Sequence, residues 1–518
     1  MVKASQQECN ARGDSFLKWT HMPEQPEDKR GLQAFLTFRN VFPIVLLSMF
    51  FVLAVRQSVT LDPDLWWHLK AGQHIVDTRS IPHTDDFSFT KRGSEWVAHE
   101  WLSELLIYGI FRLAGLVGLV CSFSLLIVVA LWITYRRCEG RPYAAALAML
   151  LAAGASSPLF GIRPQMITLL LASIYIAWLE RFTRDGQSRR LWWLLPMMLL
   201  WVNFHAGFAL GLVLIGLYLV SAVLDSEWRR MPPLAIVLLA CTAMVPLNPN
   251  GFRMFWYPYE TLTSSSMAAF IEEWASPDFH KLMFLPLAIL LLTTFGALAI
   301  SPKRARMSEL FLVLITAFAA LRSVRHIPIF ALIAAPVLAN HLWALASERG
   351  WDKLFTGEES RPTGIKLIIN TILLLAPLLL GVSRVWHFAT HEKAYEAIRN
   401  PVAAVDFLKS HQLPGPIYNR YGWGGYLIYR LYPEYRVYID GRADVYGDVF
   451  FAEAMSAYDG LGNWKQSLDH YGVNTVLISP DVALASLLRS DGEWKIVYED
   501  SKAIIFSRAR EAGSHDVD

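Results

Sequence analysis

Cysteine and charged residues are both scarce in this chain. Only four of its 518 residues are cysteine, and no Cys-x-x-Cys pair, glycine-rich phosphate-binding loop or internal repeat is found. The sequence therefore gives no support to a disulfide framework, a zinc site, thiol redox chemistry or nucleotide hydrolysis. Charged residues make up 18% of the chain and the formal net charge is +2, so no nucleic-acid partner is expected.

Hydrophobic residues, in contrast, are abundant. They make up 54% of the chain, whereas soluble proteins contain about 45–50% even when glycine is counted. A transmembrane helix needs ~20 largely apolar residues, and about eleven runs approach that length. These runs are 41–55, 113–135, 143–160, 166–179, 191–204, 208–224, 234–247, 283–300, 310–321, 327–346 and 365–382. The sequence predicts an α-helical multi-pass membrane protein.

Positive charges orient these runs, because Lys and Arg are retained on the cytoplasmic side of a membrane. Alternate connections carry the segments RRCEGR, RDGQSRR, SEWRR and SPKRAR, and Lys29, Arg30 and Arg39 precede the first run. Only the connection 347–366 is charge-neutral. With an odd number of spans, the N-terminus is expected in the cytoplasm and the chain after Arg384 outside, in a protein of the inner (plasma) membrane.

The outer connections carry most of the polar side chains. They contain Asp62, Asp64, His68, His83, Asp85, Asp86, His99, Glu100, Arg163, Gln165, Asn203, His205, Glu272, Glu273, Asp278, Arg322, Arg325 and His326. Polar groups at membrane depth persist only where they face protein or a wet cavity. We therefore expect these groups to converge on one cavity that opens to the outer side.

The first outer loop, 56–100, is long and opens with the segment LDPDLWWHL. Asp62 has a local interpretation as a helix N-cap, with Pro63 at N1 and Asp64 as a first-turn acid. Capping does not account for the second acidic cluster in the same loop, HTDDFSF, so a functional carboxylate is the alternative. The segments 65–76 and 101–113 are amphipathic and contain tryptophan, which predicts two helices on the membrane surface.

The basic side chains at the outer ends also have two interpretations. Arg163, Arg322 and Arg325 either reach to lipid headgroups or hold the phosphate of a lipid-linked substrate. His205 and His326 are either structural histidines with satisfied hydrogen bonds or ligands.

After the last run the chain changes to a soluble α/β pattern. Helices are expected at 401–412, 423–432 and 464–472, and strands at 415–419, 435–440 and 473–479. A hairpin of 493–500 and 503–508 closes the unit, and the alternation of helices and strands predicts parallel inner strands. The glycines of NRYGWGGY, around Trp423, form either a tight turn or a close backbone approach to a ligand. The expected domains are a cytoplasmic segment 1–40, a membrane domain 41–383 and an extracytoplasmic domain 384–518.

This architecture resembles the GT-C class of membrane glycosyltransferases, which use polyprenyl-phosphate-linked sugars. The shared features are the many spans, the acidic motif LDPDL in a long first outer loop, and the C-terminal outer domain. The segment YNRYGWGGYLIYRLYPEYRVYIDG is similar in order to the Trp-Trp-Asp-Tyr-Gly pattern of oligosaccharyltransferases, with Arg420 at the place of the acid. The chain also resembles bacterial multi-pass proteins that carry DPDLWWHL and WGGYL.

The resemblance implies inverting transfer of a sugar from a lipid-linked donor to an acceptor, with Asp62 and Asp64 as the catalytic carboxylates. The expected substrate-binding residues are His83, Arg163, His205, Arg322, Arg325, His326, Trp423 and Asp440. The charge of the leaving lipid phosphate would be neutralised by arginines, or by a divalent metal, Mg or Mn, held by Asp85, Asp86 or Glu273. The alternative is a transporter or a non-catalytic membrane subunit of surface-polysaccharide assembly.

Overall fold

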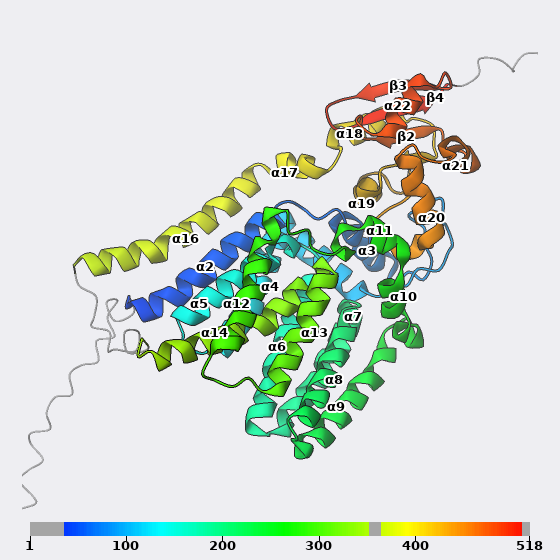
Figure 1. Cartoon of the computed structure of the whole chain (residues 1–518). Coiled ribbons are helices and arrows are strands. Elements are labelled where there is room, and N and C mark those ends of the chain that lie inside the picture. The colour runs from blue at the N-terminus through cyan, green and yellow to red at the C-terminus, as the bar shows by residue number, and fades with distance from the viewer. Residues whose placement is uncertain (1–35, 352–363, 510–518) are drawn as a thin grey trace, which may run out of the picture.

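The computed structural model describes residues 36–351 and 364–509, and helices dominate this part of the chain (Figure 1). The predicted segment 1–40 lies mostly outside the described residues, as does most of the connection 347–366. Each apolar run forms a helix. These are α2 (Phe38–Ser58), α4 (Trp101–Arg137), α5 (Tyr143–Ser156), α6 (Gln165–Asp185), α7 (Leu194–Phe204), α8 (Phe208–Leu224), α9 (Met231–Met244), α12 (Leu285–Ile300), α13 (Met307–Arg322), α14 (Ile327–Glu348) and α16 (Ile365–Thr390).

Seven helical segments of the described chain are long and apolar enough to cross a membrane. They are Phe38–Ser58, Trp101–Arg137, Gln165–Asp185, Trp228–Leu247, Leu282–Ile300, Val324–Glu348 and Ile365–Thr390. The remaining apolar helices are shorter. The predicted class, a multi-pass helical membrane protein with a small C-terminal α/β domain, is confirmed, and the number of about eleven spans stays a prediction.

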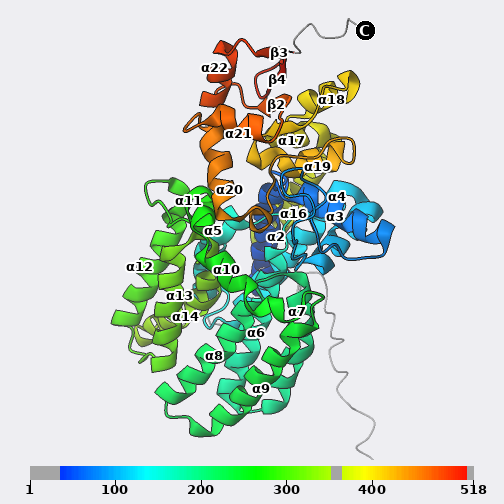
Figure 2. The same ribbon diagram turned by 90° about the vertical axis from the view of Figure 1, so that its right-hand side faces the viewer.

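The two sets of connections gather at opposite ends of the helix bundle. At one end, a cavity of about 290 Å³ is lined by the acids Glu139, Glu180, Asp225, Glu227 and Glu309 and by five basic side chains from several connections. The basic residues are Arg137, Arg184, Lys303, Arg304 and Arg306. The acidic and histidine-bearing connections lie at the other end, which also carries the C-terminal domain (Figure 2). Below, this end of the bundle is called the domain end.

The predicted amphipathic helix 101–113 forms. It is the first part of α4 and is continuous with the apolar span that follows. Gly115 interrupts the helix with φ 62° and ψ −159°. This backbone conformation is open to glycine and disfavoured for residues with a Cβ. The amphipathic piece that begins at Trp101 therefore leaves the direction of the span at Gly115.

The tryptophans of the loop 56–100 are buried inside the protein. Trp66 and Trp67 belong to α3 (Leu65–Thr78) and are only 2% and 5% exposed. Trp66 packs against the rings of Tyr426 at 5.2 Å and Tyr429 at 5.3 Å. Both tyrosines belong to α19 (Gly424–Leu431) of the C-terminal domain. The prediction that these tryptophans face the membrane is therefore wrong, because the C-terminal domain covers them.

The C-terminal domain is a four-stranded sheet with helices on it, in the strand order β1-β2-β4-β3. The strands are β1 (Ile417–Asn419), β2 (Thr475–Ile478), β3 (Trp494–Glu499) and β4 (Ile504–Arg508). The helices are α17 (Glu392–Arg399), α18 (Val402–His411), α19, α20 (Ala443–Tyr458), α21 (Trp464–His470) and α22 (Ala483–Ser490). Strands β1 and β2 are parallel, and β3 and β4 form the closing hairpin, both as predicted.

One predicted strand, 435–440, does not form, although the segment lies between β1 and the loop 56–100. In the segment 435–440 only Val437 forms bridges, one to Ile417 and one to Ser88 of the loop. The N–H of Val437 donates to the carbonyl of Phe87, and the N–H of Phe89 donates to the carbonyl of Val437, both at 3.1 Å. The loop and the C-terminal domain are thus joined through their backbones.

Candidate active site

Two acidic side chains of the first outer loop hold the C-terminal domain in place. Asp85 is 1% exposed and pairs with Arg442 at 2.8 Å. Arg442 also pairs with Asp440 at 2.7 Å, and its guanidinium lies against the ring of Trp96 at 4.6 Å. Asp86 pairs with Arg436 at 3.0 Å. These contacts form a clamp between the loop and the domain.

The expected metal site does not fit this arrangement. Asp85 and Asp86 pair with arginines of the C-terminal domain, and Glu273 pairs with Arg163 at 2.5 Å. Among the described residues, no group of three or more His, Cys, Asp or Glu side chains is placed to hold a metal ion. The prediction that Asp85, Asp86 and Glu273 share a metal is therefore not supported, and no catalytic step is assigned to a metal.

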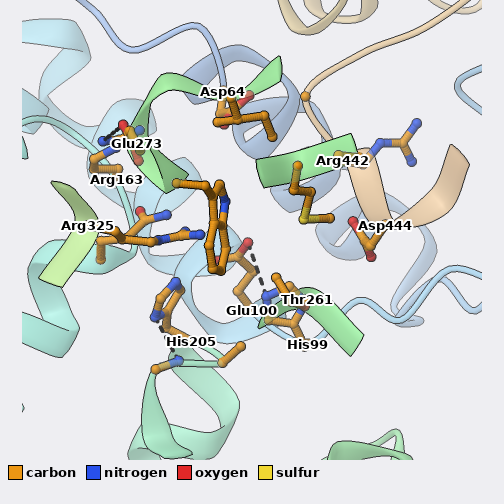
Figure 3. Close-up of a pocket in the computed structure, with 18 of the residues that line it drawn as sticks. Asp64, His99, Glu100, Arg163, His205, Thr261, Glu273, Arg325, Arg442 and Asp444 are labelled. Carbon is orange, nitrogen blue, oxygen red and sulfur yellow. Dashed lines mark hydrogen bonds and ion pairs between the residues drawn. The ribbon is translucent and has the colours of Figure 1, made fainter. Parts of the chain in front are cut away.

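A cavity of about 530 Å³ lies at the domain end (Figure 3). Its walls come from the starts of α3, α4, α6 and α8, from the segment with α10 (Tyr257–Thr263) and α11 (Ser265–Phe270), and from the C-terminal domain. Several residues expected at the site line it together. These are Asp62, Asp64, Arg163, His205, Glu273, Arg325 and His326.

The other expected residues do not line this cavity. His83 and Arg322 are exposed on the surface. Trp423 is buried in the C-terminal domain, where its indole N–H donates to the carbonyl of Arg399 at 3.0 Å. Asp440 is buried and is held by Arg442 and by the hydroxyl of Tyr446, which donates to it at 2.6 Å. The position of these residues gives no support to the predicted role in substrate binding.

Arg163 joins two carboxylates at one wall of the cavity. It pairs with Asp62 at 3.0 Å and with Glu273 at 2.5 Å. Burial alone would lower the pKa of Arg163, but the two carboxylates raise it above its ordinary value. Burial would raise the pKa of Glu273, but Arg163 and Arg325 lower it. Arg163 and Glu273 are therefore ionised at neutral pH, and the ion pairs direct Arg163 into the protein rather than to lipid headgroups.

Asp62 and Asp64 have different surroundings although they are two residues apart. Oδ1 of Asp62 accepts the backbone N–H of Asp64 at 3.0 Å, and its Oδ2 contacts Arg163. Asp64 stands at the N-cap position of α3 but makes no capping hydrogen bond, and its carboxylate lies at the cavity (Figure 3). Burial, and then the charge of Asp62, raise the pKa of Asp64 to about 7. The prediction that Asp62 is the N-cap and Asp64 a first-turn acid is therefore wrong, because α3 begins two residues later than expected. Asp62 instead accepts the N–H of Asp64, and no capping bond accounts for the carboxylate of Asp64.

Arg325 also lines the cavity, and it lies between Arg163 and His205 in Figure 3. Its guanidinium stacks over the ring of Trp274 at 4.8 Å. His205 makes local hydrogen bonds instead, because its Nδ1 contacts the backbone N–H of Gly207 and the hydroxyl of Thr168, both at 2.9 Å. Burial lowers the pKa of His205 to about 3. Arg325 therefore supplies positive charge in this part of the cavity, and His205 does not.

Several cavity residues were absent from the predicted site. Glu104 comes from the first turn of α4, and Tyr421, Gly441 and Asp444 come from the C-terminal domain. Glu104 has a sequence signal, since it is a lone acid inside the apolar segment WLSELLIYG. Tyr421 belongs to NRYGWGGY, the turn that was expected either to be tight or to approach a ligand, and Gly422 and Gly425 of this turn also line the cavity. Asp444 has no such signal, because only the docking of the C-terminal domain brings it to the cavity.

No family model matches the sequence, and no curated protein matches it. Three solved structures resemble the fold. ArnT from Cupriavidus metallidurans bound to undecaprenyl phosphate has 16% identity and a TM-score of 0.46, with 91% of this chain and 98% of that chain covered. ArnT in the apo state has 16% identity and a TM-score of 0.43, with 87% and 95% covered. The Archaeoglobus fulgidus oligosaccharyltransferase in the apo form has 10% identity and a TM-score of 0.46, with 92% and 75% covered.

Proposed function

We propose that the protein is an inverting glycosyltransferase that moves a sugar from a polyprenyl-phosphate-linked donor to an acceptor hydroxyl. The observation that carries this proposal is the position of Asp64. Its carboxyl has a pKa of about 7 and lies in a cavity that also contains Arg163 and Arg325. A general base works best when its pKa is close to the working pH. Because the cavity lies at one end of the membrane helices, the headgroup of a lipid-linked substrate in the membrane would reach this cavity.

In the proposed reaction, Asp64 is the general base. The acceptor oxygen attacks the anomeric carbon of the sugar while its proton moves to the carboxylate of Asp64. The bond between the anomeric carbon and the phosphate oxygen breaks, and the lipid phosphate leaves with the bonding electron pair. Attack from the face opposite the leaving group inverts the configuration at this carbon. Loss of such a base typically lowers the rate by ~10²–10⁴.

Arg325 is the proposed contact of the lipid phosphate. The positive charge of Arg163 is compensated by Asp62 and Glu273. Arg163 therefore stabilises the wall of the cavity. Arg325 forms no ion pair with an acid of the described chain and is held by Trp274. A guanidinium that is already positioned stabilises the negative charge that grows on the departing phosphate.

The orientation of the reaction follows from the charges at the two ends of the bundle. Arg137, Arg184, Lys303, Arg304 and Arg306 surround the small cavity opposite the domain end. Since Lys and Arg are retained in the cytoplasm, we place the domain end on the outer face of the plasma membrane. The membrane domain 41–383 and the outer domain 384–518 would then both contribute to the site.

The test compares three variants of the full-length protein. Binding of undecaprenyl phosphate is measured on each purified variant in detergent. Surface glycans are analysed by mass spectrometry in a deletion strain that carries each variant. We expect Arg325→Gln to weaken lipid binding and Asp64→Asn to abolish the glycan while lipid binding is kept. Arg322→Gln is the matched control, because Arg322 does not line the cavity. Normal glycans in the Asp64→Asn strain would instead indicate a non-catalytic subunit.

A further inference from the structure

The side of the cavity away from Arg163 is acidic. Glu100 and Asp444 lie on this side in Figure 3, together with His99. Glu104 also lines the cavity, one helical turn after Glu100, and its N–H donates to the carbonyl of Glu100 at 3.1 Å. Glu100, Glu104 and Asp444 are called the acidic wall below.

Glu104 has no partner within the described protein. Its side chain is 0% exposed, and neither carboxylate oxygen accepts a hydrogen bond. One oxygen of Glu100, Oε2, is also buried and without a partner. Burial of a polar group without a hydrogen bond costs ~1–3 kcal/mol, and such groups are rare in native proteins. Because Glu104 lines a cavity, a ligand with hydrogen-bond donors would remove this cost.

The bases near the acidic wall form their ion pairs with Glu100 or with acids outside the wall. His99 pairs with Glu100 at 3.4 Å, and Arg442 is shared between Asp85 and Asp440. Burial lowers the pKa of His68 to about 4, so this neighbour is neutral at physiological pH. In the described chain, no ion pair joins Glu104 or Asp444 to a base. Glu104 and Asp444 are therefore acidic side chains without a paired base in the described chain.

We propose that the acidic wall binds a primary ammonium group, carried either by the transferred sugar or by the acceptor. This inference rests on the sugar transfer proposed above. An ammonium group brings three N–H donors and one positive charge, which suit the three unpartnered carboxyl oxygens of Glu100 and Glu104. A sugar hydroxyl would supply only one donor to the same oxygens. A bound metal ion is not proposed as the cation, because no group of three or more His, Cys, Asp or Glu side chains among the described residues is placed to hold one.

The test uses matched pairs of probes on the full-length protein in detergent. Glucosamine is compared with glucose, and ethanolamine with ethylene glycol. Binding is followed by tryptophan fluorescence, since Trp67, Trp96 and Trp274 line the cavity. We expect the wild type to bind at least one amine about tenfold more tightly than its hydroxyl analogue. A preference for glucosamine would identify the sugar as the carrier, and a preference for ethanolamine the acceptor.

Glu104→Gln should remove this preference, and Glu434→Gln should keep it, because Glu434 is an exposed acid away from the cavity. Equal binding of amine and hydroxyl probes to the wild type would overturn the inference, as would a preference that survives in Glu104→Gln. Undecaprenyl phosphate binding is measured on the same preparations. If lipid binding is normal and the amine preference is absent, only the inference about ammonium fails. If lipid binding is also absent, the proposed sugar transfer fails as well.

Discussion

Oδ1 of Asp64 lies directly against Gly441, and a Cβ atom on Gly441 would stand 1.8 Å from it. Asp64 belongs to the first outer loop and Gly441 to the C-terminal domain, so the docked domain forms one side of this carboxylate's environment. Burial is the largest cause of the raised pKa of Asp64. The domain that covers the cavity thus also adjusts the protonation of the proposed base.

Gly441→Ala should lower sugar transfer strongly and leave the C-terminal domain folded. The added methyl group meets the Asp64 carboxylate and must displace either the side chain or the docked domain. Gly492→Ala is the control, because a Cβ at Gly492 meets no atom within 4 Å. Surface-glycan mass spectrometry reads the activity, and thermal unfolding in detergent reads the stability. A fully active Gly441→Ala protein would show that the contact does not matter for function.

The pKa of Asp64 predicts opposite trends of activity and stability with pH. Activity should rise between about pH 6 and about pH 8, because only the ionised carboxylate accepts a proton. Burial raises the pKa of Asp64 from 3.8 to about 7, so the folded protein binds more protons than the unfolded chain between these values. The contribution of Asp64 to stability is thus lost as pH rises through this range.

Asp64→Asn removes both trends. Its melting temperature relative to the wild type should increase from about pH 4 to about pH 7, and it should be catalytically inactive at every pH. Melting curves of both proteins in detergent, recorded across this range, check the prediction. A difference in melting temperature that stays constant with pH would show that Asp64 titrates normally.

Arg163→Gln should destabilise the protein by about 2–3 kcal/mol, because Asp62 and Glu273 are left without their shared cation. The side chains of this cluster are 13–27% exposed, so the cost is below that of a fully buried pair. Arg163→Lys should recover only part of the loss, since one ammonium group does not reproduce the two-pronged contact. Denaturant unfolding of the variants measures the difference, and full recovery by lysine would contradict the bridging role.

Asp85→Asn should loosen the C-terminal domain, and added Mg²⁺ or Mn²⁺ should not restore it. Arg442 would keep Asp440 but lose its buried link to the loop. Hydrogen exchange at the amides of Phe89 and Val437, which hydrogen-bond across the junction, should become faster. Asp86→Asn should have a smaller effect, because Asp86 is 44% exposed. Rescue by a metal would instead restore the hypothesis of a metal site.

Phosphatase reporter fusions test the orientation. A reporter after Arg190 or Arg306 should be inactive, and one after His391, just beyond α16, should be active. The reason is that Arg190 and Arg306 belong to the arginine-rich connections, whereas α16 leads into the C-terminal domain. An active reporter at Arg306 would place the cavity on the cytoplasmic side.

The sequence by itself determined the class of the protein and most of its elements. The apolar runs became helices, and the hairpin β3–β4 and the parallel pair β1–β2 formed as predicted. These properties depend on the length of an apolar run or on hydrophobic periodicity within a few residues, which are local quantities. The acidic and histidine-bearing connections also lie at the end of the bundle opposite the arginine-rich ones, as expected from the alternation of charge along the chain.

Only the tertiary structure decided what the acidic residues of the first loop do. Asp86 and Arg436 are 350 positions apart in the chain, and no local pattern distinguishes a carboxylate that anchors a domain from one that faces a cavity. The position of Trp66 is likewise not visible in the local sequence. Its amphipathic segment predicts a membrane surface, but in the folded protein Trp66 packs against Tyr426 of the C-terminal domain. Packing of distant segments also gives Asp62 and Asp64 different environments. The carboxylate of Asp62 contacts Arg163 and a backbone N–H, whereas that of Asp64 lies against Gly441 of the C-terminal domain.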